Sequence, residues 1–195
     1  MTMATVTDLE PCPGCGARFA PSDGPVHEYI GASAGCWALY APLAAGVGPD
    51  PAVLQSSRIG APPAVAPPPF AREGAGPLEP LLVDAYAAQH PGTPSPQAIQ
   101  SVAVHLLVLH AVFTRGVAAD SALWVRGRAL RTRGVFHWLD PRGRAPALTI
   151  RHLFPGGGVG APVAPAAYAR SVYASWAAGH EATLAGWYEA YVLGE

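Results

Sequence analysis

The stretch 94-PSPQAIQSVAVHLLVLHAVFTRG-116 decides the fold, because it carries the strongest helix signal in the chain. Ser95 is a favourable N-cap, and Pro96 suits the first helical turn, where a backbone N–H has no partner. Gly116 is a typical stop after the last turn. The residues between these signals are mostly apolar, so the stretch predicts a core helix in a mainly α-helical small bundle.

Further helical patterns lie on both sides of this stretch. They predict helices within 33–46, 78–90, 120–134 and 165–194. In the first of these, Ser33 is the expected N-cap, and Pro42 is expected to disturb the helix end. Residues 134–154 alternate around a turn at Asp140–Gly143, which predicts a short β-hairpin there.

The domain organisation follows from a change in composition. Residues 47–77 are rich in Pro and Gly and keep neither the helical nor the strand period, which is typical of an insertion or linker. We therefore expect a zinc-knuckle segment at 1–46 that packs on the core, an insertion at 47–77, and a helical core at 78–195.

Composition limits the function classes. Half of the 195 residues are hydrophobic, 13% are charged and the net charge is −1, so no nucleic-acid partner is expected. The N-terminus lacks a signal-peptide pattern, and no apolar run suggests a membrane span. We expect a cytoplasmic protein that does not bind a membrane; the sequence does not determine its oligomeric state.

Two of the three cysteines lie in 11-PCPGCG-16. A Cys-x2-Cys turn with Pro and Gly between the cysteines is typical of a zinc knuckle, because the tight turn directs two thiolates to one point. Cys36 and His27 complete a C-x2-C-x11-H-x8-C pattern, although a core His is an alternative fourth ligand. A plain turn with free thiols is the simpler alternative. The zinc deaminase signature is excluded because its upstream H-x-E half is missing.

A second polar group is expected among the core helices. Gln97, Ser101 and His105 follow one another at i, i+4 and i+8, on one face of an apolar helix. The preceding helix, an expected antiparallel neighbour, supplies Asp84 and His90. The candidate catalytic residues, as an acid/base group or a second metal site, are Asp84, His90, His105 and, from the C-terminal helix, His180. A buried hydrogen-bond network and an aromatic core stripe are the alternatives.

Several phrases together resemble a bacterial family known only as domain-of-unknown-function family 5946. They are 12-CPGCGARF-19, 23-DGPVHEYIGASAGCWALY-40, 83-VDAYAAQHPGTPSPQAIQSVAVHL-106 and 173-YASWAAGHEATLAGWY-188. The resemblance covers roughly 11–46 and 81–195, and 47–77 departs from it as an insertion. It implies that the candidate residues occupy the family's characteristic positions, and it implies no activity.

The sequence thus favours a soluble zinc-binding protein of unknown substrate. One hypothesis is a metal-dependent hydrolase or lyase, with a His or Asp as general base and a small-molecule ligand. The other is a non-enzymatic protein-interaction module with a purely structural zinc. In that case the Arg-rich segment 126–151 or the Pro-rich insertion would bind the protein partner. No Walker lysine and no G-x-S-x-G motif supports a nucleotide or serine-hydrolase site.

Overall fold

The computed structural model describes residues 9–44, 80–132, 134–141, 146–154 and 161–194, and it confirms a mainly helical fold. The α-helices are α1 (Ala34–Ala44), α3 (Pro80–Gln89), α4 (Pro96–Phe113), α5 (Leu123–Arg131) and α6 (Pro165–Tyr188). Short 3-10 helices are η2 (Ala119–Ser121) and η3 (Ile150–Leu153), and α6 continues into a π-helical turn, η4 (Glu189–Leu193). The strands are β1 (Glu10–Pro11) and β2 (Arg18–Phe19).

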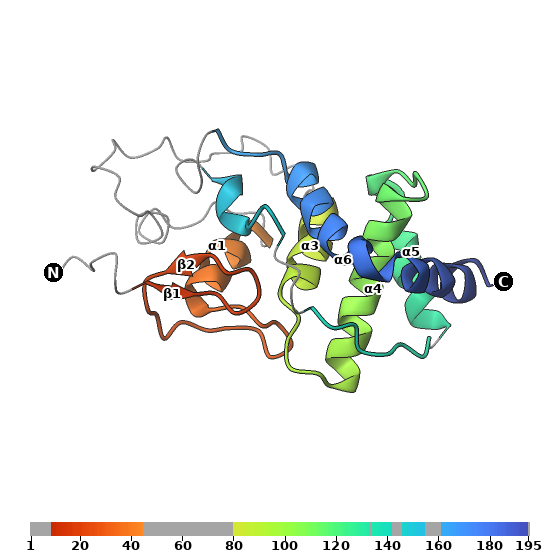
Figure 1. The fold of residues 1–195 in the computed structure, drawn as a ribbon, viewed down its shortest axis with the longest axis horizontal. Coiled ribbons are helices and arrows are strands. Elements are labelled where there is room, and N and C mark those ends of the chain that lie inside the picture. Colours follow the sequence, from red (N-terminus) through yellow and green to blue (C-terminus); the bar gives the residue numbers. More distant parts are fainter. Residues whose placement is uncertain (1–8, 45–79, 133, 142–145, 155–160, 195) are drawn as a thin grey trace, which may run out of the picture.

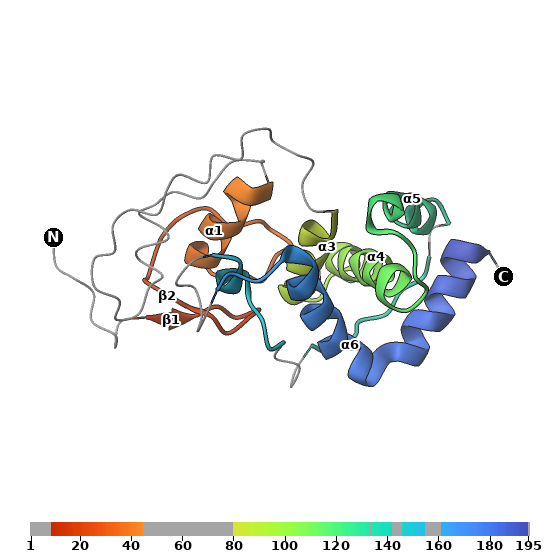
Figure 2. The same cartoon turned by 90° about the horizontal axis from the view of Figure 1, so that it is seen from above.

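The molecule is elongated, with the β1–β2 hairpin and α1 at one end and α4, α5 and the C-terminus at the other (Figure 1). Helices α3, α4 and α6 pack against one another in the centre, and α5 packs on α4 (Figure 2). Helix α1 contacts α3 and η3. The N-terminal part of the chain therefore meets the helical part at α3.

Helix α4 forms as its sequence predicts. The Ser95 side chain accepts a hydrogen bond from the Ala98 backbone N–H at 3.1 Å, and Pro96 occupies the first turn. Gly116, beyond the C-terminus, has a φ of 72°, a conformation that glycine adopts without a Cβ clash. Because α4 is surrounded by α3, α5 and α6, most of its side chains are buried.

Helix α4 is also long and apolar enough to cross a membrane, by length and composition alone. This differs from the expectation that no apolar run is long enough to suggest a span. Of this 18-residue stretch, 56% is buried inside the fold, and the core helices of soluble proteins satisfy the same criteria. The finding is therefore weak support for a membrane span.

One local expectation was wrong. The hairpin forms at 10–19, where Glu10 pairs with Phe19 and Pro11 with Arg18, and the described residues of 134–154 contain no strand. The backbone of Leu148 instead forms hydrogen bonds with side chains of two helices. Its N–H donates to Ser171 Oγ in α6, and its carbonyl accepts from Gln89 Nε2 in α3. Pro42 lies in the last turn of α1, two residues before the helix ends at Ala44.

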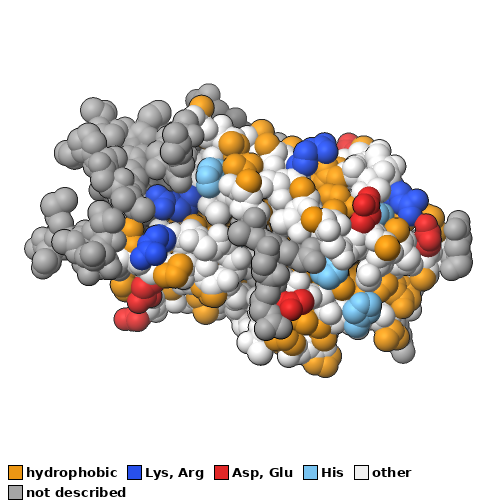
Figure 3. All heavy atoms as spheres, in the orientation of Figure 1, with side chains coloured by type: hydrophobic (Ala, Val, Ile, Leu, Met, Phe, Trp, Pro, Cys, Tyr) orange, Lys and Arg blue, Asp and Glu red, His pale blue; other side chains and the backbone are white. Residues whose placement is uncertain are grey.

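The Pro- and Gly-rich stretch 47–77 lies outside the described residues, and the division into segments stays a prediction. Charged side chains are sparse on the face drawn in Figure 3, where hydrophobic side chains lie among backbone atoms and uncharged side chains. This agrees with the low charged fraction of 13%. The architecture thus brings a short N-terminal hairpin to the end of a helical bundle.

Candidate metal centre

The β1–β2 hairpin positions the first two cysteines. The backbone N–H of Cys12 donates to the Ala17 carbonyl at 2.7 Å, and the N–H of Gly16 donates to the Cys12 carbonyl at 2.8 Å. Gly16 closes this turn with a φ of 72°. The turn leaves the side chains of Cys12 and Cys15 only 2% and 7% exposed, so both thiols face the protein interior.

The third cysteine lies in the first turn of α1. The Cys36 backbone N–H donates to Ser33 Oγ at 3.3 Å, which is the expected capping contact. The Ser33 backbone N–H in turn donates to Cys12 Sγ at 3.3 Å. The start of α1 is therefore tied to the hairpin, and Cys36 is completely buried.

His90, directly after α3, completes the cluster. Its Nδ1 lies 2.9 Å from the Tyr86 carbonyl, one helical turn earlier, and its Nε2 lies 3.3 Å from Cys36 Sγ. A carbonyl can only accept, so Nδ1 carries a proton, and in the neutral ring Nε2 presents its lone pair to Cys36 Sγ. The Tyr86 hydroxyl donates to Cys36 Sγ at 3.4 Å. Tyr86 thus orients two of the four side chains.

Glycines allow the hairpin and its following loop to approach α3 closely. A Cβ on Gly14 would lie 2.5 Å from His90 Cδ2 and 2.8 Å from His90 Cα. The Gly31 backbone N–H donates to the His90 carbonyl at 2.9 Å, beside a bridge between Ile30 and Pro91. The backbone itself therefore holds this loop against the residues that follow α3.

One ligand atom from each of the four residues lies within 4.8 Å of the others, and all four residues are buried. The sulfurs of Cys15 and Cys36 are 3.9 Å apart. In a tetrahedral zinc site, bonds of about 2.3 Å to sulfur and 2.0–2.1 Å to nitrogen place two sulfurs about 3.8 Å apart, and a sulfur and a nitrogen about 3.5 Å apart. The Cys3His cluster can therefore hold a metal ion such as zinc.

The three thiols influence one another's ionisation. Hydrogen bonds from Cys15 and Cys36 lower the pKa of Cys12 well below its usual range, against the opposing effect of burial. The hydrogen bond to Cys12 raises the pKa of Cys15 to about 12, and the same partner raises that of Cys36. One thiolate therefore forms readily, whereas its negative charge disfavours the ionisation of a second thiol. A bound cation would remove this repulsion and release the remaining protons.

His27, the expected fourth ligand, lies outside the cluster. Its side chain is exposed, and its Nδ1 accepts a hydrogen bond from the Tyr29 backbone N–H at 3.2 Å. Its ring packs near Trp37, with centroids 5.7 Å apart. The geometry gives the fourth position to His90 instead, because the C-terminal end of α3 packs directly on the hairpin.

The other candidate residues separate into two places. Asp84, buried in α3, accepts from His105 Nδ1 at 2.7 Å, so this expected pair does meet. His180, on α6, packs near Trp176 with centroids 5.9 Å apart. It is not among the residues that line the pocket beside His105, and neither is His90. At this pocket the structure thus brings together His105 and its partner Asp84, but neither His90 nor His180.

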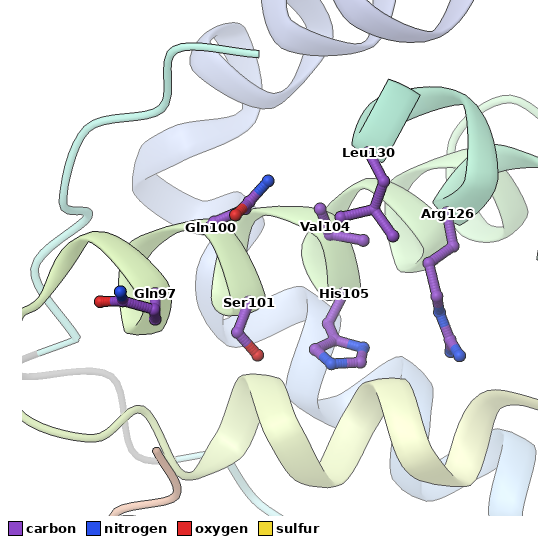
Figure 4. Close-up of a pocket in the computed structure, with 7 residues that line it drawn as sticks. All are labelled: Gln97, Gln100, Ser101, Val104, His105, Arg126 and Leu130. Carbon is purple, nitrogen blue, oxygen red and sulfur yellow. The ribbon is translucent and has the colours of Figure 1, made fainter. Parts of the chain in front are cut away.

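That pocket is a hollow of about 270 Å³ between α4 and α5 (Figure 4). Its lining consists of Gln97, Gln100, Ser101, Val104, His105, Arg126 and Leu130. Arg126 donates to Asp84 Oδ1 at 2.7 Å, so one buried carboxylate holds both basic side chains. The polar row on α4 could be predicted from its spacing, but Arg126 could not, since no local pattern distinguishes it among seven arginines within 126–151.

Two further residues near the cluster were not among the candidate site residues predicted from the sequence. Tyr86 precedes His90 by one helical turn, a spacing that would have identified it as a neighbour on the same face. Arg151 is buried, donates to the Arg18 carbonyl at 3.2 Å and lies over the Phe19 ring. Burial lowers the pKa of Arg151, and the nearby Cys15 opposes this shift. No sequence signal linked Arg151 to the hairpin.

A family model described as "Family of unknown function (DUF5946)" matches residues 69–177. Asp84, His90 and His105 lie within the matched range, whereas the three cysteines and His180 lie outside it. No curated protein and no solved structure matches the chain. The chemistry of the site must therefore be argued from its own geometry.

Proposed function

The chain belongs to the DUF5946 family, whose function is unknown, and we propose that it is a zinc-binding protein with one structural zinc ion. The ligands are Cys12, Cys15, Cys36 and His90. The observation that carries the proposal is the convergence of four buried donor atoms within 4.8 Å of one another.

The donor set favours zinc over other common metals. Three thiolates and one imidazole form a soft set, which disfavours magnesium and calcium, and tetrahedral Cys3His sites are typical of structural zinc. His90 donates a hydrogen bond from Nδ1 to the Tyr86 carbonyl, and metal-binding histidines are commonly oriented by such a bond. The imidazole therefore needs no reorientation to bind.

The charge balance also supports the proposal. Zn²⁺ with three thiolates and a neutral imidazole has a net charge of −1, which is costly in the interior without a counter-charge. Arg151 as a whole residue is 8% exposed, and its guanidinium interacts electrostatically with Cys15. A buried cation beside the thiolates would offset that negative charge.

The geometry favours the structural role over the hydrolase or lyase alternative. A catalytic zinc keeps one position open for water or substrate, whereas a structural zinc is closed by four protein ligands. All four donors here are buried, and the pocket beside His105 includes none of them. The role that follows is mechanical: zinc fastens the hairpin and α1 to the end of α3.

The test is zinc content by elemental mass spectrometry on untagged protein. We expect about one zinc per chain in the wild type and its loss in Cys15→Ser and His90→Ala. His27→Ala is the matched control, since it removes an exposed imidazole from the same end of the molecule, and it should keep its zinc. Wild-type protein that takes up no zinc even from supplemented medium would refute the proposal. Zinc retained by His90→Ala but lost by His27→Ala would refute the assignment of the fourth ligand.

A further inference from the structure

We propose that the pocket between α4 and α5 binds the oxyanion of a small organic molecule between His105 and Arg126. This site shares no residue with the Cys3His cluster, so it does not depend on the zinc proposal. The arrangement of a buried carboxylate, an imidazole and a guanidinium around one hollow carries the inference.

Asp84 fixes both basic side chains. Its Oδ1 accepts from His105 Nδ1 and from Arg126 NH2, each at 2.7 Å, while its own side chain is 2% exposed. His105 and Arg126 are more exposed, at 16% and 29%, and both line the pocket. Figure 4 shows these two side chains and Ser101 extending to the same side of α4, toward α3. The basic groups are thus held in place before a ligand arrives.

Both basic groups keep unused hydrogen-bonding capacity. A guanidinium has five N–H donors, and no described residue accepts from Arg126 Nε, which is buried. A buried donor without an acceptor costs free energy, and a ligand oxygen beside the guanidinium would supply one. On His105, Nδ1 is engaged with Asp84, which leaves Nε2 as the ring nitrogen for a ligand.

The charge of the pocket suits an anion. None of its lining residues is acidic, and the one carboxylate behind it, Asp84, is already balanced by Arg126. Because Nδ1 of His105 already donates its proton, Nε2 can donate to an anion only when the ring is protonated. The charged groups that face the ring are Asp84 from α3 and Arg126 from α5. With the ring protonated, Asp84, Arg126 and His105 together have a net charge of +1, which attracts an anion.

The remaining lining limits the size and character of the ligand. A volume of about 270 Å³ suits a small molecule, because it lies close to the lower end of typical ligand pockets, about 300 Å³. Val104 and Leu130 form an apolar wall, and Gln97, Gln100 and Ser101 offer neutral hydrogen-bonding groups. A compact anion with a short apolar part fits this combination.

The test is a calorimetric titration of the wild-type protein at low salt with benzoate and, separately, phenyl phosphate. These probes share a ring and distinguish a carboxylate from a phosphate ligand. We expect saturable binding of at least one probe with a Kd of about 1 mM or tighter, and none of benzamide, the neutral analogue. Arg126→Gln should weaken binding about tenfold or more, because a charge-assisted hydrogen bond is lost.

Arg131→Gln is the matched control, since it removes an exposed positive charge from the same helix, and it should change the Kd less than about twofold. If Arg126→Gln does not fold, NMR shift mapping on the wild type decides, with changes expected at Ser101, His105 and Leu130. Shifts that map elsewhere would overturn the proposal. The proposal would also be overturned if neither probe bound saturably at concentrations up to about 10 mM. Equal weakening of binding in Arg126→Gln and Arg131→Gln would overturn it as well.

Discussion

Cys36 Sγ and His90 Nε2 lie 3.3 Å apart although 54 residues separate them in the chain. The contact joins the first turn of α1 to the residue that follows α3. Because the same His90 donates from Nδ1 to the Tyr86 carbonyl, its orientation is fixed by the helix rather than by the cluster. A metal held here would connect the N-terminal hairpin and α1 to a helix that is independently anchored in the bundle.

Removing the metal should therefore loosen one end of the molecule selectively. After chelation, we expect amide hydrogen exchange to accelerate in residues 9–44 and near His90, while the centre of α4 stays protected. The melting temperature should fall by about 10 °C or more, because structural zinc contributes much of the free energy of such segments. Equal acceleration along the whole chain would contradict a local fastening role.

Gly14→Ala should damage the metal centre through sterics alone. The added methyl group would lie 2.5 Å and 2.8 Å from atoms of His90, so the hairpin must move away from α3. We expect a loss of about 1–3 kcal/mol in the free energy of unfolding and weaker zinc binding. Gly186→Ala is the control: nothing lies within 4 Å of its added Cβ in α6, so it should stabilise by about 0.5–1 kcal/mol. Chemical denaturation of both variants tests the pair.

Asp84→Asn should be far more costly than a change at an exposed ion pair. It weakens two charge-assisted hydrogen bonds of a buried carboxylate, to His105 and Arg126, and we expect a loss of about 2–3 kcal/mol in the free energy of unfolding. Glu189→Gln is the comparison, because its pair with Arg115 is exposed at both ends and contributes about 1 kcal/mol or less. Similar losses in urea denaturation would mean that Asp84 is not the organising group of this network.

His110 should make stability depend on pH. It is fully buried between Tyr173 and Arg115, and burial, followed by the charge of Arg115, lowers its pKa to about 4. An unfolded histidine has a pKa of about 6.5, so the unfolded chain binds more protons between these values. This contribution, about 3 kcal/mol, is therefore complete above pH 6.5 and lost as the pH falls toward 4.

The variant His110→Gln isolates this effect. It cannot titrate, so the difference in unfolding free energy between wild type and variant should shrink by about 3 kcal/mol from pH 7 to pH 4. Other acid-sensitive groups, including the cysteine cluster, cancel in this difference. A difference that stays constant over the range would show that His110 does not titrate as a buried neutral group.

The sequence by itself determined the helices and the presence of a cysteine knuckle. Capping residues such as Ser95 and terminating glycines such as Gly116 act through bonds a few residues long, so they can be read locally. The Cys12–Cys15 spacing likewise brings two sulfurs together within a single turn. The row of Gln97, Ser101 and His105 on α4 is a further local consequence of helical periodicity.

Only the tertiary structure decided which residues complete each site. His27 is closer in sequence to the cysteines than His90 is, yet His90 faces them because α3 packs against the hairpin through glycine contacts. Arg126 reaches Asp84 for a similar reason, since α5 packs on α4, and α4 packs on α3. Sequence distance predicts contacts only within one turn or helix. Donors from different elements meet where burial of the apolar faces places those elements, and that placement depends on the whole core.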